Sequence, residues 1–367
     1  RYRQVPGSNP GGGTPLFSCW HALKYHRENT FCEMATVRST ALSIPLRHAE
    51  EARRLLKNQD AIRHDLAITK DEKYIYFPVK PTLTSFPLGR LIDHSFSPRQ
   101  EKIKSYQSAI AVPPQLHALL PSSFDIVGSI ALIKIPSELM SYAARIGEAM
   151  LAANPHLTTV CQIEPVSGEL RVRGCRVIAG EQTTVTIYRE YGVLLRVDIA
   201  SVYFSPRLSS ERRRVAGRVM DGERVADLFA GAAPFSILIA KYAHPTIVYA
   251  LDKNPAAVEY ARQNVRVNQV ADRVEVILGD ARDASELIQE KVDRIIMNLP
   301  FAAHEFFSSA LSIAADHCVI HYYDMLREDE MEARQRELVA TADAVGFLVE
   351  TGPVRRIKSY SAREFYI

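Results

Sequence analysis

The chain has 367 residues, enough for two or three domains and a sizeable buried core. It is 47% hydrophobic and 24% charged, and without a run of about 18 apolar residues it gives no sign of a membrane span. The net charge of +3 is compatible with nucleic acid without demonstrating it. Five cysteines without C-x-x-C spacing argue against a disulfide framework or a metal site and predict a cytoplasmic protein.

Residues 1–35 are predicted to be a leader outside the folded protein. The chain begins at Arg1, and "VPGSNPGGGTP" is rich in Gly and Pro without periodic apolar positions. A targeting peptide is one interpretation, although an apolar signal core is absent. Another comes from the genetic code, since "GSNP" can be encoded by GGT-TCG-AAT-CC, the usual T-arm of a tRNA gene. We hypothesise that the leader is read-through of such a gene and that translation starts near Met34.

Residues 36–110 are predicted to form a small α+β domain. "RHAEEARRLLKNQ" places its apolar residues on one helical face, and "KYIYFPVK" alternates as a strand. A Pro- and Ser-containing link is predicted over "PTLTSFPLGRLIDHSFSPRQ". This region carries 13 Lys+Arg against 8 Asp+Glu, a net charge of +5. A solvated face is the ordinary explanation, and a patch facing RNA phosphates is the alternative.

Residues 111–204 are predicted to form a second α+β domain. "FDIVGSIALIKI" is a pair of apolar strands around Gly128, and "ELMSYAARIGEAMLAA" is an amphipathic helix. "TTVTIYRE" and "LLRVDIASVYF" are expected to be strands around a turn at Gly192.

Residues 205–367 change to a strand–helix alternation. Helical segments separate five expected strands at 224–229, 246–251, 274–278, 293–297 and 317–323. Such alternation predicts an α/β, doubly wound parallel sheet, preceded here by two smaller α+β domains.

The first strand end carries a turn that excludes one ligand class. "VADLFAGAAPFSI" places Asp227, Gly231 and Pro234 before a helix whose N-terminus faces the ligand side of the sheet. A dinucleotide fold requires G-x-G-x-x-G, but Ala233 and Ser236 occupy the later two glycine positions. Nicotinamide-dependent oxidoreduction is therefore disfavoured.

Polar residues also close the next three strands. Asp252 lies 21 residues after Gly231, where an acid grips ribose hydroxyls, and Asp280 can accept from an adenine amine. Asn298 opens the turn "NLPF", where an amide beside a stiff turn can hold the edge of a nucleobase. Each is common in turns when taken alone. Together they predict an adenosine-bearing ligand without pyrophosphate, which fits S-adenosyl-L-methionine.

The chain from about 124 to 367 resembles the archaeal and eukaryotic tRNA (guanine-37-N1)-methyltransferases, and 44–110 is similar to their N-terminal domain. The stretches that carry the resemblance are "GELRVR", "VYFSPRLSSERRRV", "DLFAGAAPFSI", "IMNLPFAAH", "VIHYYD" and "RRIKSYSAREFYI". The resemblance implies a Rossmann-like class I methyltransferase domain and transfer of a methyl group to N1 of guanosine 37 in tRNA. Two departures stand out: Ala233 replaces a usual Gly, and Ala362 replaces a usual Pro near the end at Ile367.

The resemblance implies a role for each candidate residue. Glu211 is the expected general base for the N1 proton, although an acid in the first turn of a helix is also ordinary. Arg171 is expected to donate to O6, with Arg173 of the same strand parity as its rival. Asn298 is expected at the guanine edge, Tyr203 on the flipped base and Arg207 at an RNA phosphate. Expected cofactor contacts are Arg212 (at the cofactor carboxylate), Asp227, Phe229, Gly231, Pro234, Asp252, Lys253, Asp280, Ala281 and Asn298.

Other functions stay open at this point. One is methylation of guanine N2, and another is a second methylation on a tricyclic wyosine precursor at position 37. A catalytically silent tRNA-binding protein is the third. We expect tRNA as partner, a monomer, and no membrane or metal site.

Overall fold

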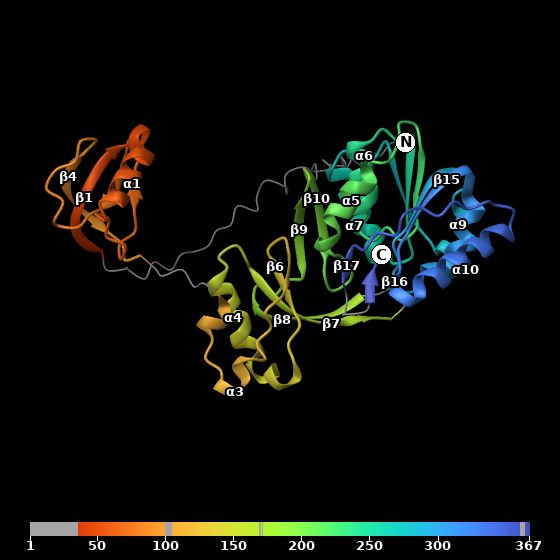
Figure 1. The fold of residues 1–367 in the computed structure, drawn as a ribbon, viewed down its shortest axis with the longest axis horizontal. Coiled ribbons are helices and arrows are strands. Elements are labelled where there is room, and N and C mark those ends of the chain that lie inside the picture. Colours follow the sequence, from red (N-terminus) through yellow and green to blue (C-terminus); the bar gives the residue numbers. More distant parts are fainter. Residues whose placement is uncertain (1–35, 100–104, 169, 171, 360–363) are drawn as a thin grey trace, which may run out of the picture. The chain divides into compact units, whose positions relative to one another are not determined.

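The computed structural model describes residues 36–99, 105–168, 170, 172–359 and 364–367 (Figure 1). The predicted leader, Arg171 and Ala362 lie outside the described residues. Contacts divide the chain into two compact units after Lys102, and each is described by itself. Within the described ranges no helix combines the length and the apolar character that crossing a bilayer would need.

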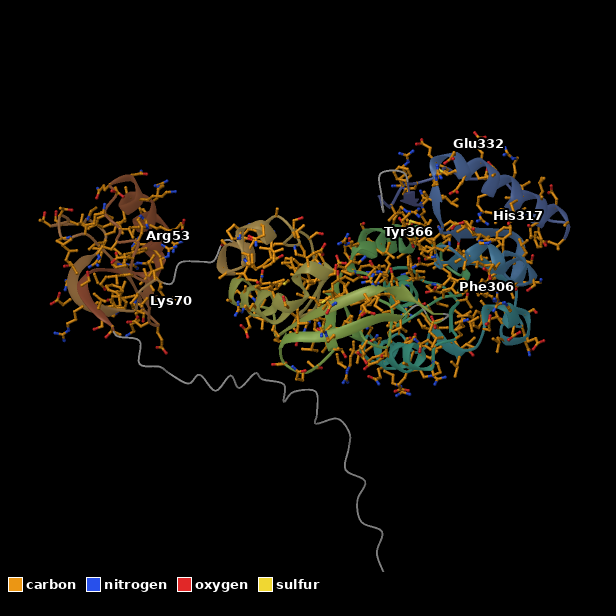
Figure 2. The ribbon with its side chains drawn as sticks, turned by 90° about the horizontal axis from the view of Figure 1, so that it is seen from below. Arg53, Lys70, Phe306, His317, Glu332 and Tyr366 are labelled. Carbon is orange, nitrogen blue, oxygen red and sulfur yellow. The ribbon has the colours of Figure 1, made fainter. Side chains whose placement is uncertain are left out.

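The first unit is a helix packed on an antiparallel sheet. Its core contains Leu42, Ile44, Leu56 and Phe77, which are fully buried. Arg53 and Lys70 are among its exposed basic side chains (Figure 2). The strands are β1 (Val37–Pro45), β2 (Thr69–Lys70), β3 (Tyr74–Pro78) and β4 (Arg90–Phe96), in the order β2-β3-β1-β4, with η1 (Leu46–His48) and α1 (Ala49–Asn58) after β1.

The segment predicted as a link contains an edge strand. β4 pairs with β1 from Val37↔Phe96 to Ser43↔Arg90, so the expectation of a plain linker is wrong over these residues. Only Phe96 of this strand is buried, and most of its side chains face solvent. An edge strand with one buried apolar residue gives little period-2 signal, which explains the missed strand.

The second unit begins before the expected boundary at residue 110. Tyr106 is buried, its hydroxyl donates to the Pro121 carbonyl, and its ring packs in the cluster of Ile146 and Met150. Its first layer has the sheet order β5-β6-β7-β8. The elements are α2 (Tyr106–Ala109), α3 (Pro114–His117), β5 (Asp125–Val127), β6 (Ile130–Ile133), η2 (Ser137–Tyr142), α4 (Ala143–Ala153), β7 (Thr159–Ser167) and β8 (Val172–Gly180).

A two-stranded hairpin, β9 (Val185–Glu190) and β10 (Val193–Asp198), packs against the parallel-sheet layer. Asn268, the residue that follows helix α7 (Pro255–Val267), accepts from the Leu194 amide at 2.9 Å and donates to the Leu194 carbonyl at 2.7 Å. Asn264 treats Arg196 in the same way, at 2.7 and 2.9 Å. These side chains satisfy an edge that would otherwise be unpaired. The hairpin therefore packs with the later layer, although the sequence assigned it to the domain ending at 204.

The predicted parallel sheet is confirmed. Its order is β13-β12-β11-β14-β15, with every neighbouring pair parallel. Figure 1 shows α5, α6 and α7 on one side of it and α9 and α10 on the other. The strands are β11 (Arg224–Asp227), β12 (Ile247–Asp252), β13 (Val274–Leu278), β14 (Val292–Met297) and β15 (Ala314–Tyr322). The helices are η3 (Pro206–Leu208), α5 (Ser209–Ala216), α6 (Pro234–Tyr242), α7 (Pro255–Val267), η4 (Ala281–Asp283), α8 (Ala284–Leu287), η5 (Ala303–Phe306), α9 (Phe307–Ile313), η6 (Glu328–Glu330) and α10 (Met331–Asp343).

A small antiparallel sheet closes the second unit. It contains β16 (Met325–Arg327), β17 (Lys358–Ser359) and β18 (Glu364–Tyr366), in the order β16-β18-β17. The Asp324 and Ile367 main chains exchange two hydrogen bonds, at 3.2 and 3.0 Å. This pairing brings Tyr366 to the carboxyl end of the parallel sheet.

Candidate active site

A cavity of about 280 Å³ opens at the carboxyl ends of β11, β12, β13 and β14. All four expected loops contribute to its wall, as the placement rule for such sheets predicts. Sequence-predicted residues that line it are Tyr203, Arg212, Phe229, Gly231, Pro234, Asp252, Lys253, Asp280, Ala281 and Asn298.

Asp252 ties the first two loops together. Its carboxylate accepts from the Gly231 amide at 2.7 Å and from the Asn254 amide at 2.9 Å. Gly231 has a φ of 57°, a left-handed conformation that glycine adopts without steric cost. Burial raises the pKa of Asp252, and the two amides oppose that shift. Asp252 thus shapes the loop after β11 while its side chain faces the cavity.

Asp227 lies behind the loop and does not line the cavity, which corrects its expected contact with a cofactor. Its Oδ2 accepts from Ser236 Oγ at 2.8 Å, and Oδ1 has no hydrogen-bond partner among the described residues. Complete burial raises its pKa to about 7, with Asp252 adding repulsion. Asp227 therefore has a structural role, in which it bonds to Ser236 beneath the loop after β11.

Ala233 has a left-handed backbone conformation, which glycine adopts without steric cost. Its φ is 62° and its ψ is 37°, just before α6, and its side chain is fully buried. A left-handed conformation costs a non-glycine residue roughly 1–2 kcal/mol. The replacement is thus accommodated as local strain, and α6 still begins at Pro234.

Asp280 stands at a polar and aromatic corner of the cavity. It caps η4 by accepting from the Arg282 amide at 2.9 Å, and Lys253 Nζ lies 3.8 Å from its carboxylate. Beside it, the rings of Phe229 and Phe306 meet edge to face with centroids 5.1 Å apart. A carboxylate acceptor next to an aromatic wall suits a flat base that carries an amine.

Asn298 is fixed by a residue from the far end of the chain. Its Oδ1 accepts from the Tyr366 hydroxyl, and no described residue accepts from its Nδ2. Since Asn298 lines the cavity, its Nδ2 group is left as a donor for a ligand. Phe301, two residues after Leu299 in the same turn, has a φ of 78°.

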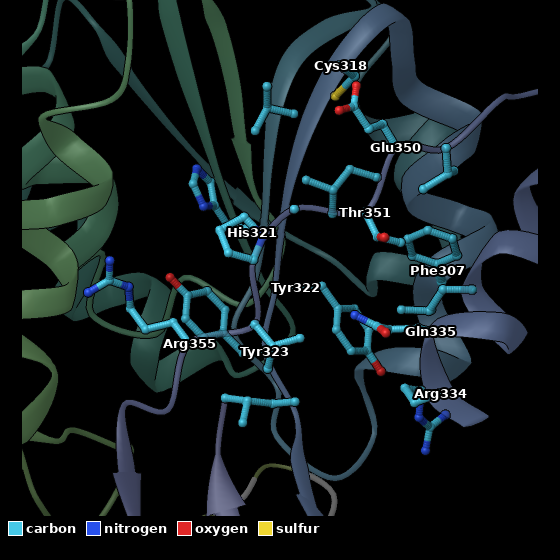
Figure 3. A pocket seen from close by; sticks show the side chains of 18 of the residues that line it. Phe307, Cys318, His321, Tyr322, Tyr323, Arg334, Gln335, Glu350, Thr351 and Arg355 are labelled. Carbon is cyan, nitrogen blue, oxygen red and sulfur yellow. The ribbon is translucent and has the colours of Figure 1, made fainter. Parts of the chain in front are cut away.

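Glu211 lies in the first turn of α5 and lines a second and larger cavity of about 1270 Å³. The wall of this cavity also includes His321 and Tyr323 (Figure 3). It is 5% exposed, and its carboxylate accepts from Arg214 Nε at 2.7 Å and Nη2 at 2.5 Å. The Tyr323 hydroxyl donates to the same carboxylate at 2.8 Å. Burial raises the pKa of Glu211, and Arg214 and Tyr323 outweigh it, so that the pKa ends below its usual value. The carboxylate is therefore ionised at neutral pH.

Of the three arginines expected to contact the cofactor or the RNA, two bind acidic side chains of the protein and one lies outside the described residues. Arg212 is buried and donates from both Nε and Nη2 to Glu190 at 2.6 Å, so its fork faces an acid of β9 and not a ligand carboxylate. Arg207 pairs with Asp125. Arg171 is outside the described residues, whereas its rival Arg173 lies over the Tyr203 ring, 5.1 Å from the centroid.

The sequence patterns did not identify the side chains that bond to Glu211 and Asn298. Arg214, Tyr323 and Tyr366 hold Glu211 and Asn298 but were not candidates. One signal was available for Tyr323, because "VIHYYD" ends the fifth strand, where ligand-side residues gather. Tyr366 gave no such signal, since its neighbours in space come from residues 68 positions earlier.

The sheet, its acidic strand ends and the cavity that they form define a Rossmann-like enzyme domain for an adenosine-bearing ligand. Three family models match the chain in consecutive stretches. The TRM5/TYW2 methyltransferase domain matches residues 186–349, the TYW2 N-terminal domain residues 107–183, and the tRNA methyltransferase 5 N-terminal domain residues 41–86.

Individual relatives match over most of the chain. It is 40% identical to tRNA (guanine(37)-N(1))-methyltransferase Trm5b of Pyrococcus abyssi, over 89% of this chain and 97% of the relative. The structure of aTrm5 with tRNALeu matches at 32% identity and a TM-score of 0.70, covering 89% and 98% of the two chains. Methanocaldococcus jannaschii Trm5 with adenosine matches at 33% identity and a TM-score of 0.60, covering 89% and 97%. The chain belongs to the tRNA (guanine(37)-N1)-methyltransferase family.

Proposed function

We propose that this protein transfers a methyl group from S-adenosyl-L-methionine to N1 of guanosine 37 in tRNA. One observation carries the proposal: acids and an amide at consecutive strand ends line one cavity, and the buried, ionised Glu211 of a second cavity is linked to that amide through Tyr323 and Tyr366. The family's activity supports the assignment, as does the relative bound to tRNA.

The donor set of the smaller cavity fits the proposed cofactor. Asp252 suits ribose hydroxyls, and Asp280 beside Phe229 and Phe306 suits adenine. A relative of known structure binds adenosine, which agrees with this fit. When bound, S-adenosyl-L-methionine supplies an electrophilic methyl group on a sulfonium. The protein's contribution is to hold that group in line with N1 and to exclude water.

Glu211 is assigned to remove the N1 proton. N1 carries this proton at neutral pH, and it becomes strongly acidic as the methyl group bonds. A carboxylate of low basicity can then accept it, so the lowered pKa of Glu211 is compatible with the role. A positioned base contributes roughly 10²–10⁴ in rate.

Two donors are assigned to the guanine face where negative charge gathers. The Nδ2 group of Asn298, whose Oδ1 accepts from Tyr366, is assigned to donate to guanine. Arg171 keeps its expected role at O6 as part of the proposal. Tyr203, on the same wall and beneath Arg173, is assigned to stack on the flipped base.

Reaching N1 requires the base to leave its stack, which costs a few kcal/mol. We assign the two α+β domains, 36–102 and 103–184, to gripping the tRNA elsewhere, which offsets that cost. The enzyme is proposed to act as a cytoplasmic monomer, since both proposed reacting groups lie on this chain.

The decisive experiment is methyl incorporation into transcribed tRNA carrying guanosine or adenosine at position 37, followed by nucleoside analysis. We expect 1-methylguanosine from the first substrate and no product from the second. 2-Methylguanosine would show that the enzyme methylates the exocyclic amine N2 instead. A product formed only on a tricyclic precursor would show that this precursor, and not guanosine, is the substrate. Absence of any methylated nucleoside would leave a tRNA-binding protein.

A further inference from the structure

Two tyrosines connect the proposed base to the proposed guanine-reading amide. Tyr323 donates to Glu211 Oε1 at 2.8 Å, and Tyr366 donates to Asn298 Oδ1. The two tyrosine rings stack on each other, with centroids 5.8 Å apart and planes 16° from parallel. The result is a continuous path from Glu211 of α5 to Asn298 at the end of β14.

Packing holds both tyrosines in place. Tyr323 is 3% exposed and Tyr366 is 6% exposed. The Tyr323 amide donates to the Met297 carbonyl at 3.3 Å, directly before Asn298, and Phe235 flanks its ring with a centroid distance of 6.1 Å. The Tyr366 carbonyl accepts from the Ile357 amide at 2.7 Å. Neither hydroxyl can move far without disturbing this core.

A buried tyrosine hydroxyl ordinarily finds some acceptor, so a hydrogen bond alone indicates no special role. Tyr322 illustrates the ordinary case, because it packs on Phe307 and donates to Asp324 at 2.7 Å. Figure 3 shows Tyr322 and Tyr323 pointing to opposite sides of the chain. Tyr323 and Tyr366 differ from Tyr322 because they donate to Glu211 and Asn298, the two residues to which we assign roles in the reaction.

We propose that Tyr323 and Tyr366 act as one positioning unit that fixes the separation and orientation of Glu211 and Asn298. This inference rests on the proposed function. Tyr323 holds the carboxylate on the side of α5 that faces β15. Tyr366 fixes the Asn298 amide so that Nδ2, and not Oδ1, is available to guanine. The stack transmits the position of one residue to the other.

The unit also affects protonation of the base. The groups that act on the Glu211 carboxylate are Arg214, Tyr323 and the neutral His321, whose pKa is lowered to about 3 by burial and by Arg294. The Tyr323 hydroxyl stabilises the ionised carboxylate. Its removal should raise the pKa of Glu211, whereas removal of the Tyr366 hydroxyl should leave that pKa unchanged.

The test is a double-mutant cycle with hydroxyl deletions that keep the rings: Tyr323→Phe, Tyr366→Phe and the double variant. Each single variant should slow single-turnover methyl transfer about 10-fold, the value of roughly one hydrogen bond. The double variant should be slowed by clearly less than the product of about 100-fold, because either change already uncouples the unit. Tyr323→Phe should also move the acidic limb of the rate–pH profile upward, and Tyr366→Phe should not.

Tyr322→Phe is the matched control and should stay within about twofold of the parent rate. Dissociation constants for S-adenosyl-L-methionine and tRNA should be parent-like in every variant, which also shows that each is folded. Phe variants with parent rates, or losses that multiply to about 100-fold, would overturn the positioning unit while leaving the proposed function intact. A parent enzyme without methyl transfer would overturn the proposed function, and this inference with it.

Discussion

The cofactor cavity and the Glu211 cluster organise their polar groups in different ways. In the cavity, the main chain contributes to the placement of both acids: Asp252, at the end of β12, accepts from two loop amides, and Asp280, just after β13, accepts from the Arg282 amide and also from Arg282 Nη1 at 3.1 Å. In the cluster, Glu211 is placed by side chains, Arg214 one turn away and Tyr323 from the end of β15.

This difference separates binding from chemistry. Acids held by backbone amides can receive hydroxyl and amine donors without rearrangement, which suits a cofactor that binds and leaves in each cycle. A carboxylate held by an arginine and a tyrosine has its basicity and direction set by those two partners. Mutations at strand ends should therefore change cofactor affinity, and mutations in the cluster should change rate and pH dependence.

The largest test of this comparison is Glu211→Gln. Glutamine keeps the size of the side chain and can keep the two hydrogen bonds accepted by Oε1, but it loses the bond from Arg214 Nε to Oε2 and cannot accept the N1 proton at useful strength. Single-turnover methyl transfer should fall by roughly 10²–10⁴. Dissociation constants for tRNA and cofactor should change little, because the lost interaction belongs to the transition state. Rapid-quench measurement with saturating enzyme provides the rate.

Glu259→Gln on α7 is the control, since Glu259 is exposed and bonds only to Gln263 among the contacts described. It should behave like the parent. A Glu211→Gln enzyme with a parent-like rate would return Glu211 to the role of an acid that complements the start of a helix.

The second test concerns Asp227, the acid that supports the cavity without lining it. Its pKa of about 7 lies above its unfolded value, so the folded state binds the extra proton between about pH 4 and pH 7. Stability should therefore fall as pH rises through that window. From pH 5 to pH 8 ionisation stabilises the unfolded carboxyl more than the folded one, and the resulting loss of stability is on the order of 3 kcal/mol.

Asp227→Asn should remove most of this slope, because an amide keeps the acceptor for Ser236 Oγ without ionising. Urea denaturation at pH 5 and pH 8 measures it, with Asp283→Asn, an exposed residue of η4, as control. Equal slopes in parent and variant would mean that Asp227 is ionised throughout.

The third test is Asp252→Ala, which removes a cavity acceptor and the anchor of the Gly231 amide. Affinity for S-adenosyl-L-methionine should fall by about 10–100-fold, the value of one hydrogen bond to a charged group. Affinity for tRNA should hardly change. Calorimetric titration with each ligand separates the two, and equal losses for both would break the comparison by showing that this strand end is structural for the whole site.

The cofactor cavity was largely predictable from the sequence. Apolar strand cores separated by helices predict the sheet, and the carboxyl ends of parallel strands necessarily meet at one edge. Asp252, Asp280 and Asn298 could therefore be assigned to one site from their positions alone. Asp227 follows the same pattern yet lies behind its loop, because strand position does not specify which way the side chain turns.

The Glu211 cluster was not predictable in the same way. Its acid, Glu211, was assigned from the family resemblance. Tyr366, which stacks on Tyr323 of the cluster, bonds to Asn298, 68 positions earlier in the sequence. Such a contact depends on how β18 pairs with β16, which follows from packing and not from periodicity. The edge strand β4 was missed for a related reason, since solvent-facing strands carry little pattern.

The smallest effect is expected for Arg214→Gln, which removes the cation that pairs with Glu211 and leaves Glu211 itself in place. Glu211 accepts a proton only when it is deprotonated, so the rate of methyl transfer should fall as pH falls through the pKa of its carboxyl. In the parent enzyme this acidic fall should lie below the usual pKa of 4.5, because the pKa of Glu211 is lowered. Without the guanidinium, the effect of burial is no longer outweighed, and the pKa of Glu211 should rise.

The Arg214→Gln profile should thus lose rate at pH 5 and recover toward the parent above pH 7. Single-turnover rates from pH 4.5 to pH 8 measure it. Arg213→Gln is the matched control, because the Arg213 guanidinium lies over the Tyr242 ring, 3.8 Å from its centroid, and does not pair with Glu211. A parent limb near pH 6.5 would indicate that Arg214 has already left Glu211 in the enzyme–tRNA complex. The Glu211–Arg214 ion pair would then exist only in the free enzyme. The final position of the Glu211 side chain would be set when tRNA binds and would not be a fixed property of the site.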